Sequence, residues 1–139
     1  MAVKKYVEEK VIFITGGASG FGFCLAKKCL ELGAKVILTD VDQDAVKRAL
    51  DQISAPESSM IGLTCDVTNA EQLQEAVQEA LRLYARVDVM VNNAGVMPLA
   101  CLADHKAAYR AWNACIDINF KGVLHGIIAV YDQMITQGS

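Results

Sequence analysis

The sequence predicts an α/β fold in which a doubly wound parallel sheet of about four strands is covered by helices. Apolar runs that suit buried strands alternate along the 139 residues with stretches of helical periodicity. Because the connections are short, this alternation predicts right-handed crossovers and a parallel sheet. Apolar residues make up 53% of the chain, which fits strands buried on both faces.

Four apolar runs are predicted to form the strands, in the ranges 11–15, 36–40, 61–65 and 87–91. Strands of this length with branched apolar side chains are typical of a buried parallel sheet. If the first strand lies between the second and the fourth, the strand order reverses between the first and the fourth. Open parallel sheets bind ligands at such a reversal, beyond the carboxyl ends of the strands.

The first two helices have clear start and stop signals. One helix is predicted from the glycine turn after the first strand to about Leu32, where Gly33 stops it. Asp42 is predicted to cap the next helix, which ends before the segment 55–59 that contains a proline and two serines.

The later helices are longer. Thr68 and Glu71 suggest a capping box for a helix that ends near Tyr84. A long helix is predicted over residues 106–137, and its apolar residues exceed what a soluble monomer normally exposes. Its glycines at positions 122 and 126 leave a notch where another element can approach closely.

The turn from Thr15 to Gly22 is predicted to cradle a diphosphate. Gly16 permits the tight turn, Gly20 lets the anion approach the backbone, and Gly22 lets the helix pack close to the strand. The helix amino terminus then supplies free N–H groups. A glycine-rich turn without a ligand is the alternative. The residues assigned to the cradle are Gly16, Ala18, Ser19, Gly20, Phe21 and Gly22.

Asp40, at the end of the second strand, favours NAD over NADP. A carboxylate there accepts hydrogen bonds from a ribose diol and repels a 2′-phosphate. Neither Ser19 nor Val41 supplies a cation that would hold such a phosphate. The alternative is that Asp40 only caps the following helix.

Composition excludes several classes of function. The net charge of −3 and the lack of any Lys/Arg cluster argue against a nucleic-acid surface. The amino end is too polar for a signal peptide, and no apolar run approaches the length of a membrane span. Five cysteines without metal-ligand spacing indicate reduced thiols in a cytoplasmic protein with no metal site.

Several of these motifs occur together in one order. Thr15-Gly16-x-x-x-Gly20-x-Gly22, Asp40, Asp66-Val67, the run 92–95 (Asn-Asn-Ala-Gly) and Asn119 resemble the short-chain dehydrogenase/reductases from about Val11 onward. The resemblance implies a Rossmann fold, with Asp66 at the adenine amino group and Val67 beside its ring. It also implies that the run 92–95 supports the central strand and lines the nicotinamide-ribose side. The cofactor-binding positions after the cradle are thus Asp40, Val41, Cys65, Asp66, Val67, Asn93, Ala94 and Gly95.

Asn119 matches the asparagine of the family's catalytic tetrad, which holds a water in a proton relay. Asparagine is a poor helix former. If Asn119 is buried, its amide must find partners or cost about 1–3 kcal/mol, so something polar should then lie beside it. A purely structural hydrogen bond is the alternative. For Asp66, the alternative is a carboxylate that only turns the chain before Thr68.

The chain departs from the family in one respect. The family's serine and its Tyr-x-x-x-Lys follow the fifth strand, whereas this chain stops before that strand. Tyr6 and Lys10 have the same spacing, but they precede the first strand and should lie at the opposite end of the sheet. We therefore expect this domain, residues 1–139, to bind NAD weakly and not to turn over alone.

The predicted function is NAD-dependent hydride transfer between an alcohol and a carbonyl, with this chain supplying the cofactor-binding half. A carboxyl-terminal half, in the same product or a second chain, is expected to bring Ser, Tyr and Lys and to cover the apolar helix. A homo-oligomer is expected as well. The alternative is a non-catalytic dinucleotide-binding or assembly module. A flavodoxin-like binder fits less well, since it would not require Asp40 or the Asn-Asn-Ala-Gly run.

Overall fold

The computed structural model describes residues 2–138, with side chains from residue 5 onward. Its parallel sheet has the order β3-β2-β1-β4, so β1 lies between β2 and β4 as the predicted crevice requires. The doubly wound α/β fold is confirmed. The strands are β1 (Val11–Thr15), β2 (Lys35–Asp40), β3 (Met60–Thr64) and β4 (Val89–Val91).

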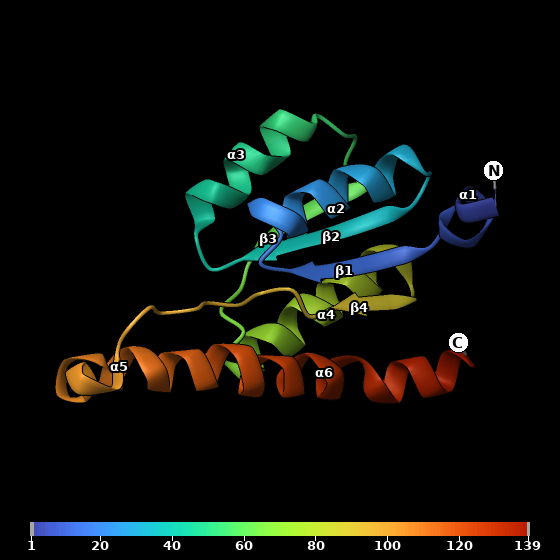
Figure 1. Cartoon of the computed structure of the whole chain (residues 1–139). Coiled ribbons are helices and arrows are strands. Elements are labelled where there is room, and N and C mark those ends of the chain that lie inside the picture. The colour runs from blue at the N-terminus through green and yellow to red at the C-terminus, as the bar shows by residue number, and fades with distance from the viewer. Residues whose placement is uncertain (1, 139) are drawn as a thin grey trace.

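Helices cover both faces of the sheet (Figure 1). Helices α2 (Gly20–Glu31) and α3 (Gln43–Ile53) lie on one face, and α4 (Ala70–Tyr84) lies with the long carboxyl-terminal helix on the other. All of β1 is buried. Its side chains alternate, because Ile12 and Ile14 pack toward α2 and α3 while Val11 and Phe13 pack toward α4.

Side-chain caps set the starts of α3 and α4. Asp42 caps α3 as expected, with Oδ1 accepting from the N–H groups of Asp44 and Ala45 at 2.9 and 3.0 Å. The capping box predicted for α4 is wrong, because Thr68 Oγ1 donates to the Asp66 carboxylate instead. Asn69 caps α4.

Strand β4 starts two residues later than predicted, at Val89. Strand β3 is shifted by one residue toward the amino terminus relative to the predicted range 61–65. The backbone of Val87 is held by the Gln137 side chain at 3.1 and 2.9 Å. The Asp88 side chain, 3% exposed, accepts from the Val11 N–H and pairs with Lys10 and Arg86. Burial alone would raise the pKa of Asp88, but these bonds outweigh it and lower that pKa.

The predicted long helix contains a local irregularity. After a short 3₁₀ turn at Leu102–Asp104, helix α5 (His105–Ile116) passes into a π-helical turn (Asp117–Lys121) and then into α6 (Gly122–Gln137). The sequence-based expectation of a helix over 106–137 is otherwise confirmed. Turns of this kind are frequent at functional sites.

The expectation that no segment is long and apolar enough to span a membrane is wrong. The helical segment Leu102–Gln137 is long enough and apolar enough to do so, judged by length and composition alone. Core helices of soluble proteins meet these two criteria too. This helix packs Ala129 and Val130 into the core beside α4.

The glycine notch of this helix is filled by the chain itself, because Val67 lies against Gly122 and Asn92 lies against Gly126. Large apolar side chains on the other side are exposed: Ile116, Phe120, Leu124, Ile127, Ile128, Tyr131 and Ile135.

Candidate functional site

The glycine turn joins β1 to α2 with no room for side chains. Gly16 has φ +60°, and a Cβ there would lie 2.7 Å from Ala94 Cα. A Cβ on Gly22 would lie 2.5 Å from the Gly16 oxygen and 2.6 Å from Asn93 Nδ2. Gly20, with φ +54°, has no atom within 4 Å of the position of a Cβ. The turn is therefore packed on the protein side and open on the solvent side.

Unpaired backbone donors gather at the amino end of α2. Among residues 2–138, no acceptor bonds the N–H groups of Gly20, Phe21 or Gly22, and the side chain of Ser19 does not cap the helix. The N–H of Ala18 is already occupied, since it donates to Asp40 Oδ2 at 3.2 Å. Three aligned donors at a helix amino terminus form an arrangement suited to an anion.

The Asp40 carboxylate lies beside this turn at the end of β2. Its Oδ1 accepts from the Asp42 N–H at 3.3 Å, and its Oδ2 accepts from Ala18. The helix-cap interpretation of Asp40 is wrong, because Asp42 performs that role. Asp40 lines a cavity of about 470 Å³ at the carboxyl ends of the strands, and none of the lining residues is Lys or Arg.

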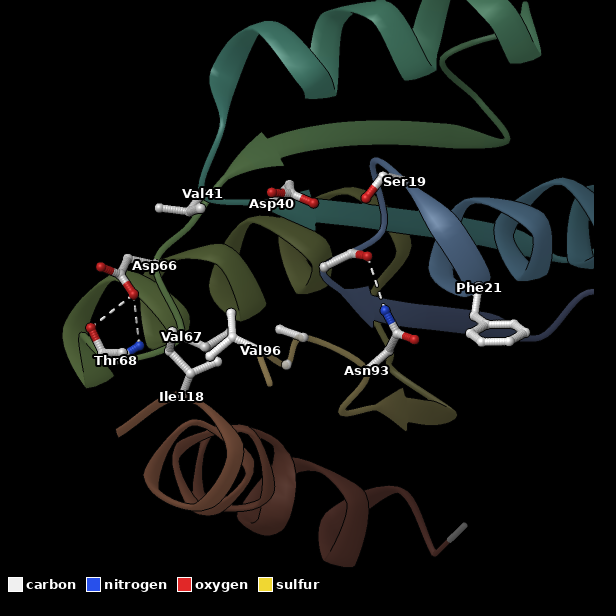
Figure 2. A pocket seen from close by; sticks show the side chains of 13 residues that line it. Ser19, Phe21, Asp40, Val41, Asp66, Val67, Thr68, Asn93, Val96 and Ile118 are labelled. Atoms are coloured by element: carbon white, nitrogen blue, oxygen red, sulfur yellow. Dashed lines mark hydrogen bonds between the residues drawn. The ribbon is translucent and has the colours of Figure 1, made fainter. Parts of the chain in front are cut away.

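The Asp66 carboxylate bounds the same cavity beyond β3. One of its oxygens accepts from the N–H and the hydroxyl of Thr68, at 2.9 and 2.8 Å, so it does turn the chain as the alternative interpretation held. The other oxygen has no partner among the described residues. Figure 2 shows Asp66 and Phe21 toward opposite ends of the cavity. A carboxylate oxygen therefore remains able to accept a ligand hydrogen bond.

Asn93 ties β4 to β1 across the strand-order reversal. Its Nδ2 donates to the carbonyl oxygens of Thr15 and Gly16 at 3.0 and 2.9 Å. Thr15 Oγ1 accepts from the N–H groups of Asn93 and Ala94, both at 3.1 Å. These bonds confirm that the Asn-Asn-Ala-Gly run supports the central strand.

Most of the sequence-predicted residues meet at one cavity. Ten of them line it: Gly16, Ser19, Phe21, Asp40, Val41, Asp66, Val67, Asn93, Ala94 and Gly95. Five do not line it: Ala18, Gly20, Gly22, Cys65 and Asn119. Thr68, Val96 and Ile118 also line the cavity but were not among the predicted site residues. The first two directly follow predicted motifs, whereas nothing in the sequence marks Ile118, which the helix brings in.

Cys65 lies at the end of β3 but is turned into the core, 2% exposed. Burial, with a smaller effect of the neighbouring Asp66 charge, raises the pKa of its thiol to about 11. Its backbone N–H donates to the main-chain carbonyl oxygen of Asp40 at 2.8 Å. This bond fixes the separation of the ends of β2 and β3. The thiol itself is protonated and away from the cavity.

The Asn119 side chain lies in the π-helical turn and clamps the loop after β4. Its Oδ1 accepts from the Val96 N–H at 2.9 Å, and its Nδ2 donates to the Val96 oxygen at 2.7 Å and to Cys115 Sγ at 3.3 Å. The structural hydrogen bond considered as an alternative is therefore present. Val96 lies with Val67 and Ile118 at the cavity wall (Figure 2).

Comparison with protein families matches residues 10–139 to the short chain dehydrogenases. The chain belongs to the short-chain dehydrogenase/reductase family. An uncharacterized oxidoreductase of Listeria monocytogenes is 38% identical over 96% of this chain and 53% of its own length. A (2S)-[(R)-hydroxy(phenyl)methyl]succinyl-CoA dehydrogenase subunit of Thauera aromatica is 31% identical over 93% of this chain and 51% of its own.

Solved structures of short-chain dehydrogenases superpose closely. One from Burkholderia phymatum, in complex with NAD, has a TM-score of 0.86 at 36% identity and matches 96% of this chain and 47% of its own. A 3-ketoacyl-(acyl-carrier-protein) reductase from Brucella melitensis, complexed with NADH, has a TM-score of 0.86 at 28% identity. The match covers 95% of this chain and 53% of the reductase chain. This short-chain dehydrogenase chain therefore spans about half the length of the relatives it matches.

The Tyr-x-x-x-Lys at positions 6 and 10 lies away from the site of this short-chain dehydrogenase. Tyr6 belongs to α1 (Ala2–Val7) and is 77% exposed. Helix α1 precedes β1 at the amino end of the sheet (Figure 1), and Lys10 pairs with Asp88 there. No tyrosine is among the residues lining the cavity.

Proposed function

We propose that this chain is the cofactor-binding half of an NAD-dependent oxidoreductase that interconverts an alcohol and a carbonyl by hydride transfer. The proposal rests chiefly on the turn after β1, where the unpaired N–H groups at the amino end of α2 adjoin a cavity lined by Phe21 and by the carboxylates of Asp40 and Asp66. Gly20, Phe21 and Gly22 would hold the diphosphate, Asp40 the ribose, and Asp66 with Val67 the adenine. A relative named as an oxidoreductase and a similar short-chain dehydrogenase/reductase structure in complex with NAD support this assignment.

The preference for NAD follows from charge. A 2′-phosphate placed on the ribose beside Asp40 would meet a carboxylate and no cation, since no lining residue is Lys or Arg. A ribose diol can instead donate to Asp40 Oδ1 or Oδ2 in place of the present backbone donors. The bound nicotinamide supplies the hydride chemistry, and this chain binds and orients it.

The remaining catalytic groups come, in this proposal, from the part of the complete enzyme that corresponds to the rest of the relatives' length. That part supplies Ser, Tyr and Lys and covers the exposed apolar face of α6, and this chain alone does not turn over. Asn119 contributes by holding Val96, and with it the cavity wall, in place for the proton relay. The working protein is a cytoplasmic homo-oligomer acting on a small alcohol or carbonyl.

The Asp40→Ala variant of the complete enzyme tests the proposal. We expect affinity for NAD(H) to fall about tenfold or more and affinity for NADP(H) to change little, because only the diol loses its acceptor. Asp42→Ala is the matched control: it removes the carboxylate that caps α3, costs about 1 kcal/mol of stability, and leaves the cofactor ratio unchanged. An unchanged NAD/NADP ratio in Asp40→Ala contradicts the ribose assignment.

A non-catalytic dinucleotide-binding module is the second candidate, favoured by the lack of a tyrosine among the lining residues. Intact mass and peptide sequencing of the protein from its native source separate the two candidates. A segment bearing Tyr-x-x-x-Lys, in the same product or in a copurifying chain, supports the enzyme. Tight NAD binding by a folded 139-residue protein without such a segment supports the module.

A further inference from the structure

A hydrogen bond from His125 ties the loop between β3 and α4 to α6. His125, half-buried on α6, has its Nδ1 2.8 Å from the Val67 carbonyl oxygen. Because a carbonyl oxygen can only accept, Nδ1 carries the proton. That oxygen has no other partner among the described residues. One helical turn earlier, a Cβ on Gly122 would lie 2.8 Å from Val67 Cγ2, so the helix and the loop are in direct contact.

The other bonds of this loop hold residues on either side of Val67. The Cys65 N–H donates to β2, the Asp66 N–H donates to Gln72 Oε1 of α4 at 3.0 Å, and Thr68 bonds the Asp66 carboxylate. None of these fixes how far Val67 stands from α6. The His125 bond does so, because it joins the layer of the long helix to the loop backbone. Val67, only 7% exposed, then forms the wall of the cavity next to Asp66.

We propose that His125 is a positioning residue for the adenine side of the cofactor site. This inference rests on the proposed function, since it takes the wall formed by Asp66 and Val67 to be the adenine wall. His125 does not line the cavity and touches no reacting atom. Its hydrogen bond fixes the distance of the Val67 backbone from α6. At that distance the Val67 side chain can pack against the adenine ring, and one oxygen of the Asp66 carboxylate stays free to accept from it.

Asparagine and leucine make a matched pair of substitutions. The amide nitrogen of asparagine can take the place of Nδ1 and donate to Val67, whereas leucine has nearly the same shape and no donor. In the complete enzyme, ADP-ribose reports on the adenine side and nicotinamide mononucleotide reports on the other side. Both affinities can be measured by calorimetry at one pH and salt concentration.

We expect His125→Leu to weaken ADP-ribose about tenfold and to leave nicotinamide mononucleotide within about twofold, because a buried carbonyl is left unpaired beside the adenine side only. His125→Asn should bind both ligands within about threefold of the wild type. With dinucleotide as the substrate, His125→Leu should raise KM and leave kcat nearly unchanged.

Two further variants guard against a merely structural effect. Gln137→Leu removes comparable bonds from the same helix to Val87, at the opposite end of the sheet, and should leave ADP-ribose affinity unchanged. Gly122→Ala keeps His125 but forces Val67 away from α6, and should weaken ADP-ribose selectively. It provides the test if His125→Leu does not fold.

The outcomes separate this inference from the proposed function. A wild-type enzyme that binds neither ADP-ribose nor NAD(H) overturns both. Wild-type binding of ADP-ribose with unchanged affinity in His125→Leu overturns only the positioning role. Equal weakening of both ligands, or failure of His125→Asn to restore binding, also overturns it, because either result means that the hydrogen bond to Val67 is not what matters.

Discussion

Replacement of Gly22 by alanine should damage the fold, because the added methyl group has no room at the start of α2. The new Cβ would lie 2.5 Å from the Gly16 oxygen and 2.6 Å from Asn93 Nδ2, and 3.0 Å from Gly17 Cα. Two of these contacts are with backbone atoms that cannot rotate away. Either α2 moves off β1, or Asn93 leaves its place.

The cost can be worked from these contacts. Overpacking of a tight site costs about 1–3 kcal/mol. Displacement of Asn93 adds the loss of its bonds to Thr15 and Gly16, about 0.5–1.5 kcal/mol each. Alanine's better helix propensity returns up to about 1 kcal/mol. We expect the free energy of unfolding to fall by about 1–6 kcal/mol.

Gly20→Ala is the matched control, since its Cβ would meet nothing within 4 Å. Its cost is the left-handed backbone, φ +54°, at about 1 kcal/mol. Its methyl group enters the open side of the turn, so NADH affinity should fall more than about tenfold. Urea unfolding followed by circular dichroism, with NADH fluorescence titration, measures both quantities. A Gly22→Ala protein as stable as the wild type, or less affected than Gly20→Ala, refutes the packing argument.

Three further predictions concern single side chains. Asp88→Asn should lower stability by about 1–3 kcal/mol at pH 7. Because the folded pKa of Asp88 is lowered, its contribution is complete above the unfolded pKa of about 4 and lost as pH falls through the folded value. The difference from the wild type should therefore shrink in acid, and a gap independent of pH would contradict this. Asn119→Leu should lower kcat about tenfold or more by releasing Val96, and an unchanged kcat would show that the clamp is not needed. At pH 8, alkylation followed by mass spectrometry should find Cys101 modified and Cys65 unmodified, because burial raises the pKa of Cys65 to about 11; equal labelling would be inconsistent with the structure.

Local signals predicted the strands and helices well, and failed where distant side chains intervene. The cap of α3 by Asp42 depends only on neighbouring N–H groups, and it is confirmed. The capping box at Thr68 looked equally good, but its hydroxyl is used by Asp66. The start of β4 was missed because Gln137, at the end of α6, takes the backbone bonds of Val87.

The candidate site shows the same division. Gly16 and Asp40 were found because each lies at the end of a predicted strand, and parallel strands bring these ends to one edge. Asp66 was assigned only through the family resemblance. Ile118 and His125 were not assigned to the site, because their place depends on how the long helix lies across the sheet. Asn119 is exposed, so the argument from a buried amide does not apply to it, but its amide does bond the Val96 backbone, a partner that only the fold identifies.

By itself, the sequence determined the class of fold, the order of its elements and the glycine turn that faces a ligand. Strand burial, helix capping and backbone freedom at glycine are properties of short segments, so they can be recognised along the chain. Only the tertiary structure decided that Asn93 bonds β1, that Asn119 clamps Val96 and that His125 holds Val67. Each of these contacts joins residues at least 20 positions apart, so it exists only after the layers have packed.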